Sequence, residues 1–393
     1  MQVERIELIG FRNYENLDIR VYPGVNVLFG DNAQGKTNIL ESIYMCACAR
    51  SHRTSRDTDI IRHEDDFYSI KLSYANKVQQ EEIVVSFQNA DPKTLERARA
   101  TRTVLHNGMR LPRVADMMGL FHAVIFAPED LMLVKEGPAS RRRYLDLLIS
   151  QIRPTYFSDL QAFTRALSQR NALLKRIRET RSGSVEDPEL EVWEDAMSES
   201  GSRLIHARQQ VSARIMEIAA REHARISSDT ESLVVRYRTV STVREGDSQR
   251  EIADKYRTRL RLAAREDAEK GMTSQGPHRD DLELGLDGEG LRPFASQGQQ
   301  RSAVLALKLA ELQVLEEETG EPPVLLLDDV MSELDSRRRN ALIEGMGSAQ
   351  VFVTCTDAAH VGGDMKELAA RGRGMHYFRV ERGQVAESPD LLI

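Results

Sequence analysis

The chain has 393 residues, 41% hydrophobic and 29% charged, a composition typical of a water-soluble globular protein long enough for two structural units. Its net charge of −7 excludes a protein that binds nucleic acid through bulk positive charge, so any nucleic-acid surface must be a local patch. Only three cysteines, and no apolar run or leader pattern suited to a membrane or to export, predict a cytoplasmic protein with free thiols.

The N-terminal part has the pattern of short strands around one helix. Strands are expected where β-branched and apolar residues gather, and a hairpin turn is expected at Asn107-Gly108. The expected strands are 3–10, 17–21, 24–30, 67–75, 79–87, 103–111 and 122–131, and the expected helix is 39–49.

From residue 139 the apolar residues fall at helical spacing. A helix at 141–152 ends at Pro154, and two long helical segments separated by a polar loop then predict an antiparallel helical arm. These segments are 156–179 and 192–226, followed by a strand at 232–240 and a charged helix at 249–271.

Strand character returns at 281–288, in the apolar run 322–330 and at 351–357. We therefore expect an α/β protein with an inserted helical arm lobe. Residues 1–138 and 271–393 would form the two halves of one lobe, and residues 139–270 the arm.

GDNAQGKT, residues 30–37, lies between an expected strand and an expected helix, as a phosphate-binding P-loop does. Its glycines let the backbone wrap phosphates, and amide N–H groups at the helix start point at phosphate oxygens. Lys36 would reach the β- and γ-phosphates of ATP, and the Thr37 hydroxyl would ligate Mg²⁺. The predicted nucleotide-binding residues are Gly30, Asp31, Asn32, Ala33, Gln34, Gly35, Lys36, Thr37 and Asn38.

VLLLDD, residues 324–329, is an apolar run that ends in two carboxylates. Buried strands that end in an acidic turn are common, so this pattern gains its meaning from the P-loop. We expect Asp328 to hold Mg²⁺ together with Thr37, and Asp329 to orient or deprotonate the attacking water. Lys36, Asp328 and Asp329 are the predicted catalytic residues.

Most of the chain separates these two motifs, and a glycine-centred stretch, FASQGQQRS at 294–302, precedes a helix at 303–318. An arm inserted between two halves of one nucleotide-binding fold is typical of SMC-type heads of ABC ATPases, and SQGQQ resembles their signature motif. That resemblance implies that Ser296, Gly298 and Gln299 close over the γ-phosphate held by a second subunit. The residues alone are also compatible with an ordinary helix capped by Ser296.

Seven stretches together resemble the RecF family of bacterial recombination-mediator ATPases, over nearly the whole chain. They are GFRNYENL (10–17), GDNAQGKTNILESIY (30–44), SHRT (51–54), FAPEDLMLVKEGPASRRRYLD (126–146), GPHRDDLEL (276–284), SQGQQR (296–301) and LLLDDVMSELD (325–335).

The resemblance implies an ABC-type P-loop ATPase head that uses ATP and Mg²⁺ and forms an ATP-dependent homodimer. It implies binding to double-stranded and gapped DNA, cooperation with RecR and RecO in loading recombinase, a place at the nucleoid, and no membrane. It also implies that Arg12 and Asn13 contact nucleotide and that Asp335 lies near the dimer seam.

Three positions depart from the broader ABC pattern. Thr356 stands where a switch histidine is usual, Asp329 stands where a glutamate is usual, and Glu129 or Asp130 stands near the usual Q-loop glutamine. These departures predict slow hydrolysis, suited to a switch rather than to a motor.

Two basic clusters are candidates for contacts with DNA phosphates, although solvated faces paired with acids explain them equally well. The first comprises Lys93, Arg97, Arg99, Arg102, Arg110 and Arg113, and the second comprises Arg141, Arg142, Arg143, Arg165, Arg170, Lys175, Arg176 and Arg178. His278 and Arg279 are expected to brace the signature stretch through Asp280 or Asp281, and Trp193 to pack in the arm core.

Three other functions are less compatible with the sequence. A phosphotransferase acting on a small molecule gives no role to SQGQQ. The ATPase subunit of a membrane transporter usually has a switch histidine and a shorter helical subdomain. A structural SMC protein would have far longer arms.

Overall fold

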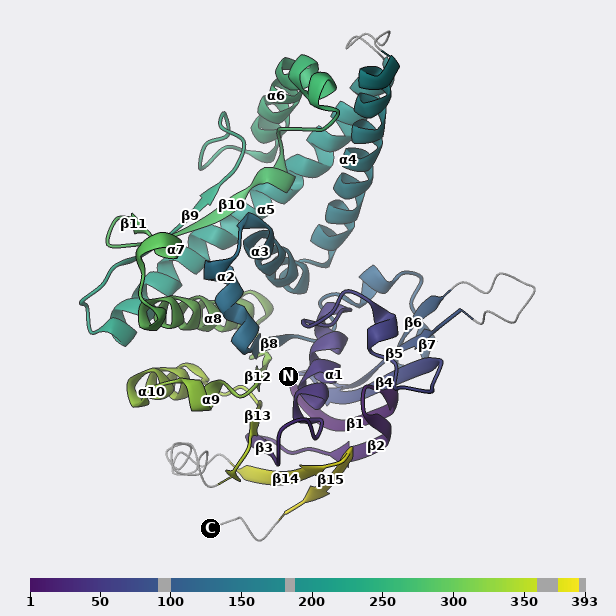
Figure 1. Cartoon of the computed structure of the whole chain (residues 1–393), viewed down its shortest axis with the longest axis vertical. Coiled ribbons are helices and arrows are strands. Elements are labelled where there is room, and N and C mark those ends of the chain that lie inside the picture. The colour runs from purple at the N-terminus through teal and green to yellow at the C-terminus, as the bar shows by residue number, and fades with distance from the viewer. Residues whose placement is uncertain (91–99, 181–187, 359–373, 389–393) are drawn as a thin grey trace. The chain divides into compact units, whose positions relative to one another are not determined.

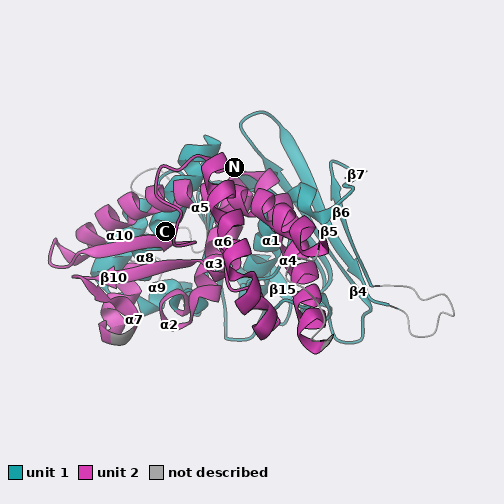
Figure 2. Ribbon diagram, turned by 90° about the horizontal axis from the view of Figure 1, so that it is seen from above, with its two compact units in different colours: residues 1–131, 304–393 teal, residues 132–303 magenta. Residues whose placement is uncertain are grey.

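The computed structural model describes residues 1–90, 100–180, 188–358 and 374–388 (Figure 1). They form two compact units: unit 1 comprises Met1–Leu131 with Val304–Ile393, and unit 2 comprises Met132–Ala303 (Figure 2). The sequence analysis had placed residues 271–303 in the C-terminal half of the ATPase lobe. In the structure they group with the arm instead. The reason is strand pairing, because the strand at 281–286 pairs with the strand at 233–238.

The first sheet of unit 1 is antiparallel and has the strand order β2-β1-β4-β5-β6-β7. Its strands are β1 (Gln2–Phe11), β2 (Tyr14–Arg20), β4 (Phe67–Ala75), β5 (Gln80–Gln88), β6 (Thr101–His106) and β7 (Met109–Arg110). Alternate residues of β4 are buried, as expected for a strand with one face on the core. Asn107 and Gly108 both have positive φ, 50° and 77°, which confirms the predicted hairpin turn.

The second sheet of unit 1 has the order β15-β14-β3-β13-β12-β8, and every pair except β14 with β15 is parallel. Its strands are β3 (Val25–Phe29), β8 (Ala123–Phe126), β12 (Val324–Leu327), β13 (Val351–Cys355), β14 (Met375–Glu381) and β15 (Gln384–Glu387). β8, β12 and β13 are buried along their whole length, since a parallel sheet is covered on both faces. The loops that follow β3, β12, β13 and β8 meet at one edge of this sheet.

Helix α1 (Lys36–Cys48) contacts strands of both sheets, which explains why eleven of its thirteen residues are buried. Cys46 and Cys48 are free thiols, as expected, and both are buried. Among the described residues, the further α-helices of the unit 1 segments are α9 (Val330–Glu333) and α10 (Ser336–Gly345), and α8 (Gln297–Thr319) has residues in both units. The sequence analysis did not predict α10, because among its ten residues only Ala341, Leu342 and Ile343 are buried.

Unit 2 is a helical lobe with a small three-stranded sheet of order β11-β10-β9. Its elements are α2 (Met132–Lys135), α3 (Pro138–Ile152), α4 (Pro154–Thr180), α5 (Pro188–Ser227), β9 (Leu233–Arg238), α6 (Gln249–Lys270), β10 (Asp281–Leu286), β11 (Glu289–Gly290) and α7 (Leu291–Phe294). The break between α3 and α4 at Pro154 confirms the expected boundary. No helix in the described part of the chain is long and apolar enough to cross a membrane.

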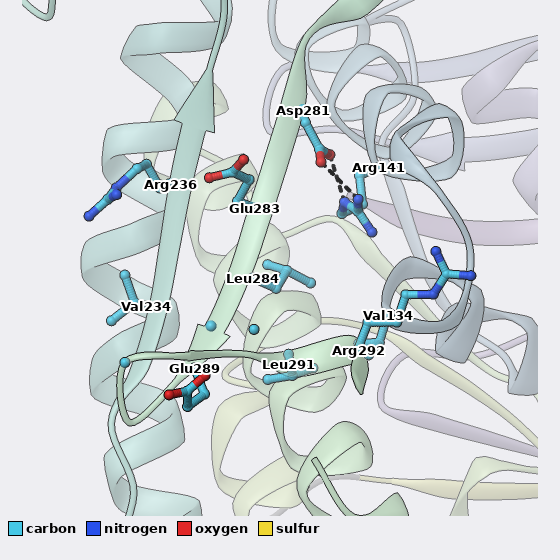
Figure 3. Close-up of a pocket in the computed structure, with 13 residues that line it drawn as sticks. Val134, Arg141, Val234, Arg236, Asp281, Glu283, Leu284, Glu289, Leu291 and Arg292 are labelled. Atoms are coloured by element: carbon cyan, nitrogen blue, oxygen red, sulfur yellow. Dashed lines mark hydrogen bonds and ion pairs between the residues drawn. The ribbon is translucent and has the colours of Figure 1, made fainter. Parts of the chain in front are cut away.

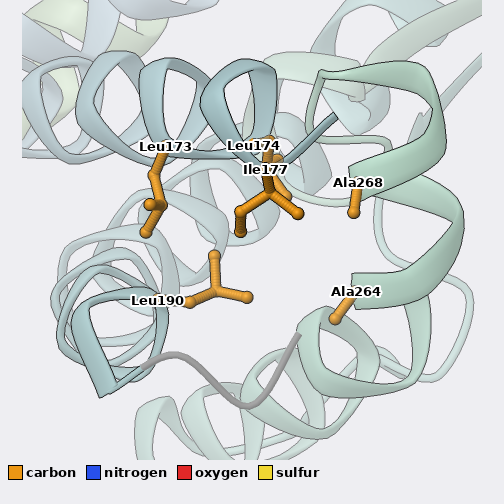
Figure 4. Close-up of a cluster of buried hydrophobic side chains, with 6 residues drawn as sticks. All are labelled: Leu173, Leu174, Ile177, Leu190, Ala264 and Ala268. Carbon is orange, nitrogen blue, oxygen red and sulfur yellow. The ribbon is translucent and has the colours of Figure 1, made fainter. Parts of the chain in front are cut away.

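A cluster of buried aliphatic side chains joins α4, α5 and α6 (Figure 4). Leu173, Leu174 and Ile177 of α4 meet Leu190 of α5, and Trp193 packs against the cluster, which confirms its predicted place in the arm core. α5 and α6 approach closely at Gly201, where a Cβ atom would lie 2.7 Å from the Tyr256 ring. This packing holds the arm as one body.

Candidate nucleotide-binding site

The P-loop between β3 and α1 depends on two glycines in the left-handed region. Gly30 and Gly35 have φ of 148° and 117°. A Cβ atom at Gly30 would lie 2.3 Å from the Val380 carbonyl oxygen, and one at Gly35 would lie 2.6 Å from Asn13 Nδ2. Helix α1 begins at Lys36, and Gly35 offers no side chain to cap it. The loop therefore has the backbone shape that the sequence pattern predicts.

The stretch after β1 supports this loop from outside. Asn13 Nδ2 donates to the Gln34 carbonyl oxygen at 2.8 Å, and Asn38 Nδ2 donates to Asn13 Oδ1 at 2.8 Å. The Tyr14 hydroxyl donates to the Gly35 carbonyl oxygen at 3.1 Å. Asn13 is thus engaged with the loop, and direct contact with nucleotide stays a prediction.

Arg12 is engaged in a similar way, with a carboxylate on α1. Its Nε and Nη2 donate to the two oxygens of Glu41 at 2.9 and 2.6 Å. Glu41 is fully buried, and burial opposes its ionisation, but hydrogen bonds from Arg12 and Ser51 and the charge of Arg53 leave its pKa below the usual value. The Ser51 hydroxyl oxygen also accepts the backbone N–H of Arg53 at 2.9 Å. This network explains the SHRT stretch, to which the sequence analysis gave no role.

Lys36 and Thr37 occupy the first turn of α1. Lys36 Nζ donates to the carbonyl oxygens of Gly30 and Asp31 at 2.6 and 2.8 Å, which holds the ammonium group over the loop. Thr37 Oγ1 donates to Asp328 Oδ1 at 2.8 Å. The structure thus joins the P-loop to the acidic end of β12, across 291 positions of the chain.

Asp328 is held by both neighbouring strands of the parallel sheet. Its backbone N–H donates to the Phe126 carbonyl oxygen of β8 at 2.9 Å, and its carboxylate accepts from Thr354 of β13 at 2.9 Å. Burial raises the pKa of Asp328, although the hydrogen bonds from Thr37 and Thr354 oppose this shift. A nearby cation would stabilise the ionised form of this buried carboxylate.

Thr354 is a site residue that the sequence analysis missed. Its hydroxyl oxygen also accepts the backbone N–H of Asp329 at 2.8 Å, and so it contacts both acidic residues. Asp329 has φ of 51°, a left-handed conformation that this contact supports. The sequence analysis considered Thr356, which is exposed beyond the end of β13. The available signal was a lone hydroxyl in the otherwise apolar strand VFVTC.

The turn after β8 lies at the same sheet edge. Asp130 accepts the backbone N–H of Ala127 at 2.8 Å and so closes its own turn, and burial raises its pKa. Glu129 is exposed. Of the two proposed replacements for the Q-loop glutamine, Glu129 is therefore the one with an accessible carboxylate.

The signature stretch, residues 294–302 in unit 2, forms a reciprocal capping box at the start of α8. Gln299 N–H donates to Ser296 Oγ at 3.2 Å, and Ser296 N–H donates to Gln299 Oε1 at 2.7 Å. Gln299 Nε2 donates to Glu231 at 3.0 Å. Ser296 and Gln297 are exposed, whereas Gly298 is half-buried. The ordinary capping role is thus present, and the contact of Ser296, Gly298 and Gln299 with a second subunit stays a prediction. In unit 1, Asp335 caps α10 by accepting the backbone N–H of Arg338 at 2.9 Å.

Within unit 2, the stretches EGPASRRRYLD (136–146) and GPHRDDLEL (276–284), both part of the family resemblance, contact each other. Arg141 Nε and Nη2 donate to the carboxylate of Asp281 at 2.7 and 2.9 Å, beside a hollow of about 420 Å³ (Figure 3). Arg208 of α5 donates to Asp146 and Asp280 at 2.8 Å each. The expectation that Asp280 and Asp281 tie His278 and Arg279 to the signature stretch is therefore wrong. Among the described contacts, these carboxylates join α3 and α5 instead.

Several arginines proposed for DNA contact are engaged within the protein. Arg170 is fully buried between Asp267 and Glu194, at 2.7 and 2.9 Å, and Arg141 is held by Asp281. Arg142 donates to the Asp280 carbonyl oxygen at 2.7 Å. Two arginines of the first basic cluster also form ion pairs within the protein, Arg102 with Asp57 and Arg113 with Asp116.

Other members of the two clusters are exposed. These are Arg110, Arg143, Arg165, Lys175, Arg176 and Arg178, of which Arg176 pairs with Glu189 at 2.7 Å and Arg178 donates to the Lys270 carbonyl oxygen at 3.0 Å. Lys93, Arg97 and Arg99 lie outside the described residues.

The fold and the site define a class of protein, an ABC-type ATPase head of the SMC kind. Over 98% of this chain and 96% of the other, the fold matches a solved Smc head domain from Pyrococcus furiosus with a TM-score of 0.52 and 16% identity. A model described as the RecF/RecN/SMC N terminal domain matches residues 2–370.

Relatives with higher sequence identity show which family within this class the chain belongs to. The chain is 38% identical to a "DNA replication and repair protein RecF" of Acetivibrio thermocellus, over 98% of this chain and 99% of the relative, and 39% identical to one of Heliobacterium modesticaldum, over 99% and 100%. A solved structure of "the recombination mediator protein RecF-ATP in RecFOR pathway" matches with a TM-score of 0.87 and 33% identity, over 98% and 97%. The chain belongs to the RecF family, within the RecF/RecN/SMC group of proteins.

Proposed function

We propose that this protein is an ATP-dependent DNA-binding protein of recombinational repair. ATP binding closes a head-to-head homodimer on DNA at gaps or junctions, and slow hydrolysis reopens it. Together with RecO and RecR the closed dimer helps to load recombinase, and the protein acts at the nucleoid. The observation that carries the proposal is the 2.8 Å hydrogen bond between Thr37 and Asp328, which unites the P-loop with the acidic strand end. The names of the relatives support the DNA-repair context.

The roles of the site residues follow from the contacts described above. The amide groups of residues 30–38 cradle the phosphates, and Lys36 exchanges its loop carbonyl partners for phosphate oxygens. Asp329, held by Thr354, orients or deprotonates the attacking water. Asn13 and Arg12 keep the loop in place, beside any contact they make with nucleotide.

Thr37 and Asp328 together fit Mg²⁺. Magnesium prefers oxygen ligands and takes few of them from the protein when phosphates are present. A hydroxyl and a carboxylate 2.8 Å apart, the latter desolvated, satisfy that preference. Bound Mg²⁺ would neutralise charge on the phosphates.

In trans, Ser296 and Gly298 would contact the γ-phosphate held by the partner subunit, with Gln299 fixing the start of α8. The exposed position of Ser296 at a helix N-terminus supports this role. A small-molecule phosphotransferase would leave this surface unused.

Sedimentation tests the dimer. The Asp329→Asn protein, which is expected to bind ATP without hydrolysing it, should double its mass when ATP and Mg²⁺ are added. Adding Ser296→Arg should prevent the doubling, whereas Thr258→Arg, at an exposed position of α6, should leave it intact. Nucleotide binding without any change in mass, with or without gapped duplex DNA, would refute the closing dimer.

A further inference from the structure

The small sheet of unit 2 has an open edge. In the order β11-β10-β9, one side of β9 pairs with β10, and no described strand pairs with the other side (Figure 1). Every second backbone N–H and C=O group of β9 therefore faces away from the sheet. Such an edge is a template for one more strand.

A groove runs along this edge. It has a volume of about 390 Å³ and is lined by β9 and the residues that follow it, Val234–Ser241, and by one stripe of α5. The stripe consists of Gln209, Ser212, Ala213 and Met216, which share one helix face. Met216 and Val234 are 40% and 39% exposed, so both add apolar surface to the groove. The groove thus offers apolar contacts beside the free backbone edge.

Ser212 is a buried polar residue among those that line the groove. Its side chain is 3% exposed, and its hydroxyl has no hydrogen-bond partner within the described residues. Buried hydroxyls are almost always hydrogen-bonded.

Charge defines the occupant further. The exposed face of β9 carries Val234, Arg236 and Arg238, which occupy every second position of the strand. Successive members are about 7 Å apart. Arg236 is exposed and forms no ion pair within the described residues, and it projects from β9 on the side away from β10 (Figure 3). Arg238 pairs with Glu283 at 3.0 Å on the neighbouring strand, and Glu245 is an acid at the rim. A strand added beside β9 would place its own side chains opposite these residues.

We propose that the β9 edge binds an extended segment of a partner protein by strand addition. The segment alternates acidic residues, opposite Arg236 and Arg238, with apolar residues that enter the groove beside Ala213 and Met216. This surface is separate from the nucleotide site, and its use does not depend on the function proposed above.

The test uses the full chain and a short fluorescent peptide, of the length of β9, in which glutamate alternates with valine. Fluorescence anisotropy should show that the peptide binds with a dissociation constant below about 1 mM. Arg236→Glu should weaken binding about tenfold, whereas Arg250→Glu, an exposed arginine on α6, should leave it unchanged. Replacing glutamate by lysine in the peptide should also weaken binding about tenfold.

Backbone methylation separates strand addition from simple charge attraction. Only alternate N–H groups of an added strand point at β9. N-methylation in one register should therefore abolish binding, and in the other register it should change the affinity less than about threefold. Equal effects in both registers, or no effect of Arg236→Glu, would overturn the proposal. Binding of duplex DNA at this edge without any peptide binding would also overturn it, because it would assign the arginines to nucleic acid.

Discussion

Replacing Thr354 by valine tests how the acidic strand end is organised. Valine keeps the shape of threonine but removes the hydroxyl that donates to Asp328 at 2.9 Å and accepts from Asp329 N–H at 2.8 Å. Leaving a fully buried N–H group unpaired costs about 1–3 kcal/mol, and because the Asp329 N–H is only partly buried we expect Thr354→Val to destabilise the protein by about 1 kcal/mol.

The effect on catalysis follows from the same two contacts. Asp329 loses the contact that fixes its left-handed backbone, and Asp328 loses a donor that favours its ionised form. We expect ATP turnover to fall about 10- to 100-fold, which corresponds to about 1.4–2.7 kcal/mol of transition-state stabilisation. The affinity for ATP should change less than about threefold, because the P-loop itself is unaltered.

Turnover would be measured against ATP concentration beside a urea unfolding curve. Thr354→Ser keeps the hydroxyl and serves as the matched control, and Thr356→Val tests the neighbouring exposed threonine. Both are expected to retain turnover within about threefold. Wild-type turnover in Thr354→Val would refute the reasoning, and so would an equal loss in Thr354→Ser.

Three further predictions concern other parts of the molecule. Asp328→Asn should lower turnover at least about 100-fold and abolish the tightening of ATP binding by Mg²⁺. Because burial raises the Asp328 pKa, its ionised form destabilises the metal-free protein above the unfolded pKa, and the asparagine variant should unfold no earlier than the parent at pH 8. A lower unfolding midpoint would contradict this. Arg208→Met leaves Asp280 buried without its cation and should cost about 3–5 kcal/mol in urea unfolding. Adding Asp280→Asn should recover part of that loss, and simple additivity would show that the pair is not coupled. Burial lowers the pKa of His278 to about 4, against about 6.5 when unfolded, so the unfolded chain takes up the proton first as pH falls. Between pH 7.5 and 5.5 the protein should lose about 1 kcal/mol of stability through this residue. His278→Gln, which keeps a donor for the Thr273 carbonyl oxygen, should remove that slope in pH-dependent urea titrations.

Features that depend on contiguous residues could be predicted from the sequence. The P-loop needs a strand, two glycines and a helix in succession, and residues 24–49 contain all of them. The Asn107-Gly108 turn, the break at Pro154 and the helical periodicity of the arm are local as well. The acidic end of the apolar run 322–330 indicated a site residue, since a strand that is apolar throughout is buried on both faces.

Features that depend on pairing between distant segments were decided only by the tertiary structure. Charge and spacing show that Arg141, Arg170 and Arg208 are cations, but not that each is paired with a carboxylate within the arm. The unit boundary moved because β10 pairs with β9, and Thr354 became a site residue because β13 lies beside β12. The physical reason is the same in each case. A hydrogen bond or ion pair is set by a distance of about 3 Å in space, and a sequence records no such distance between segments that meet only in the folded chain.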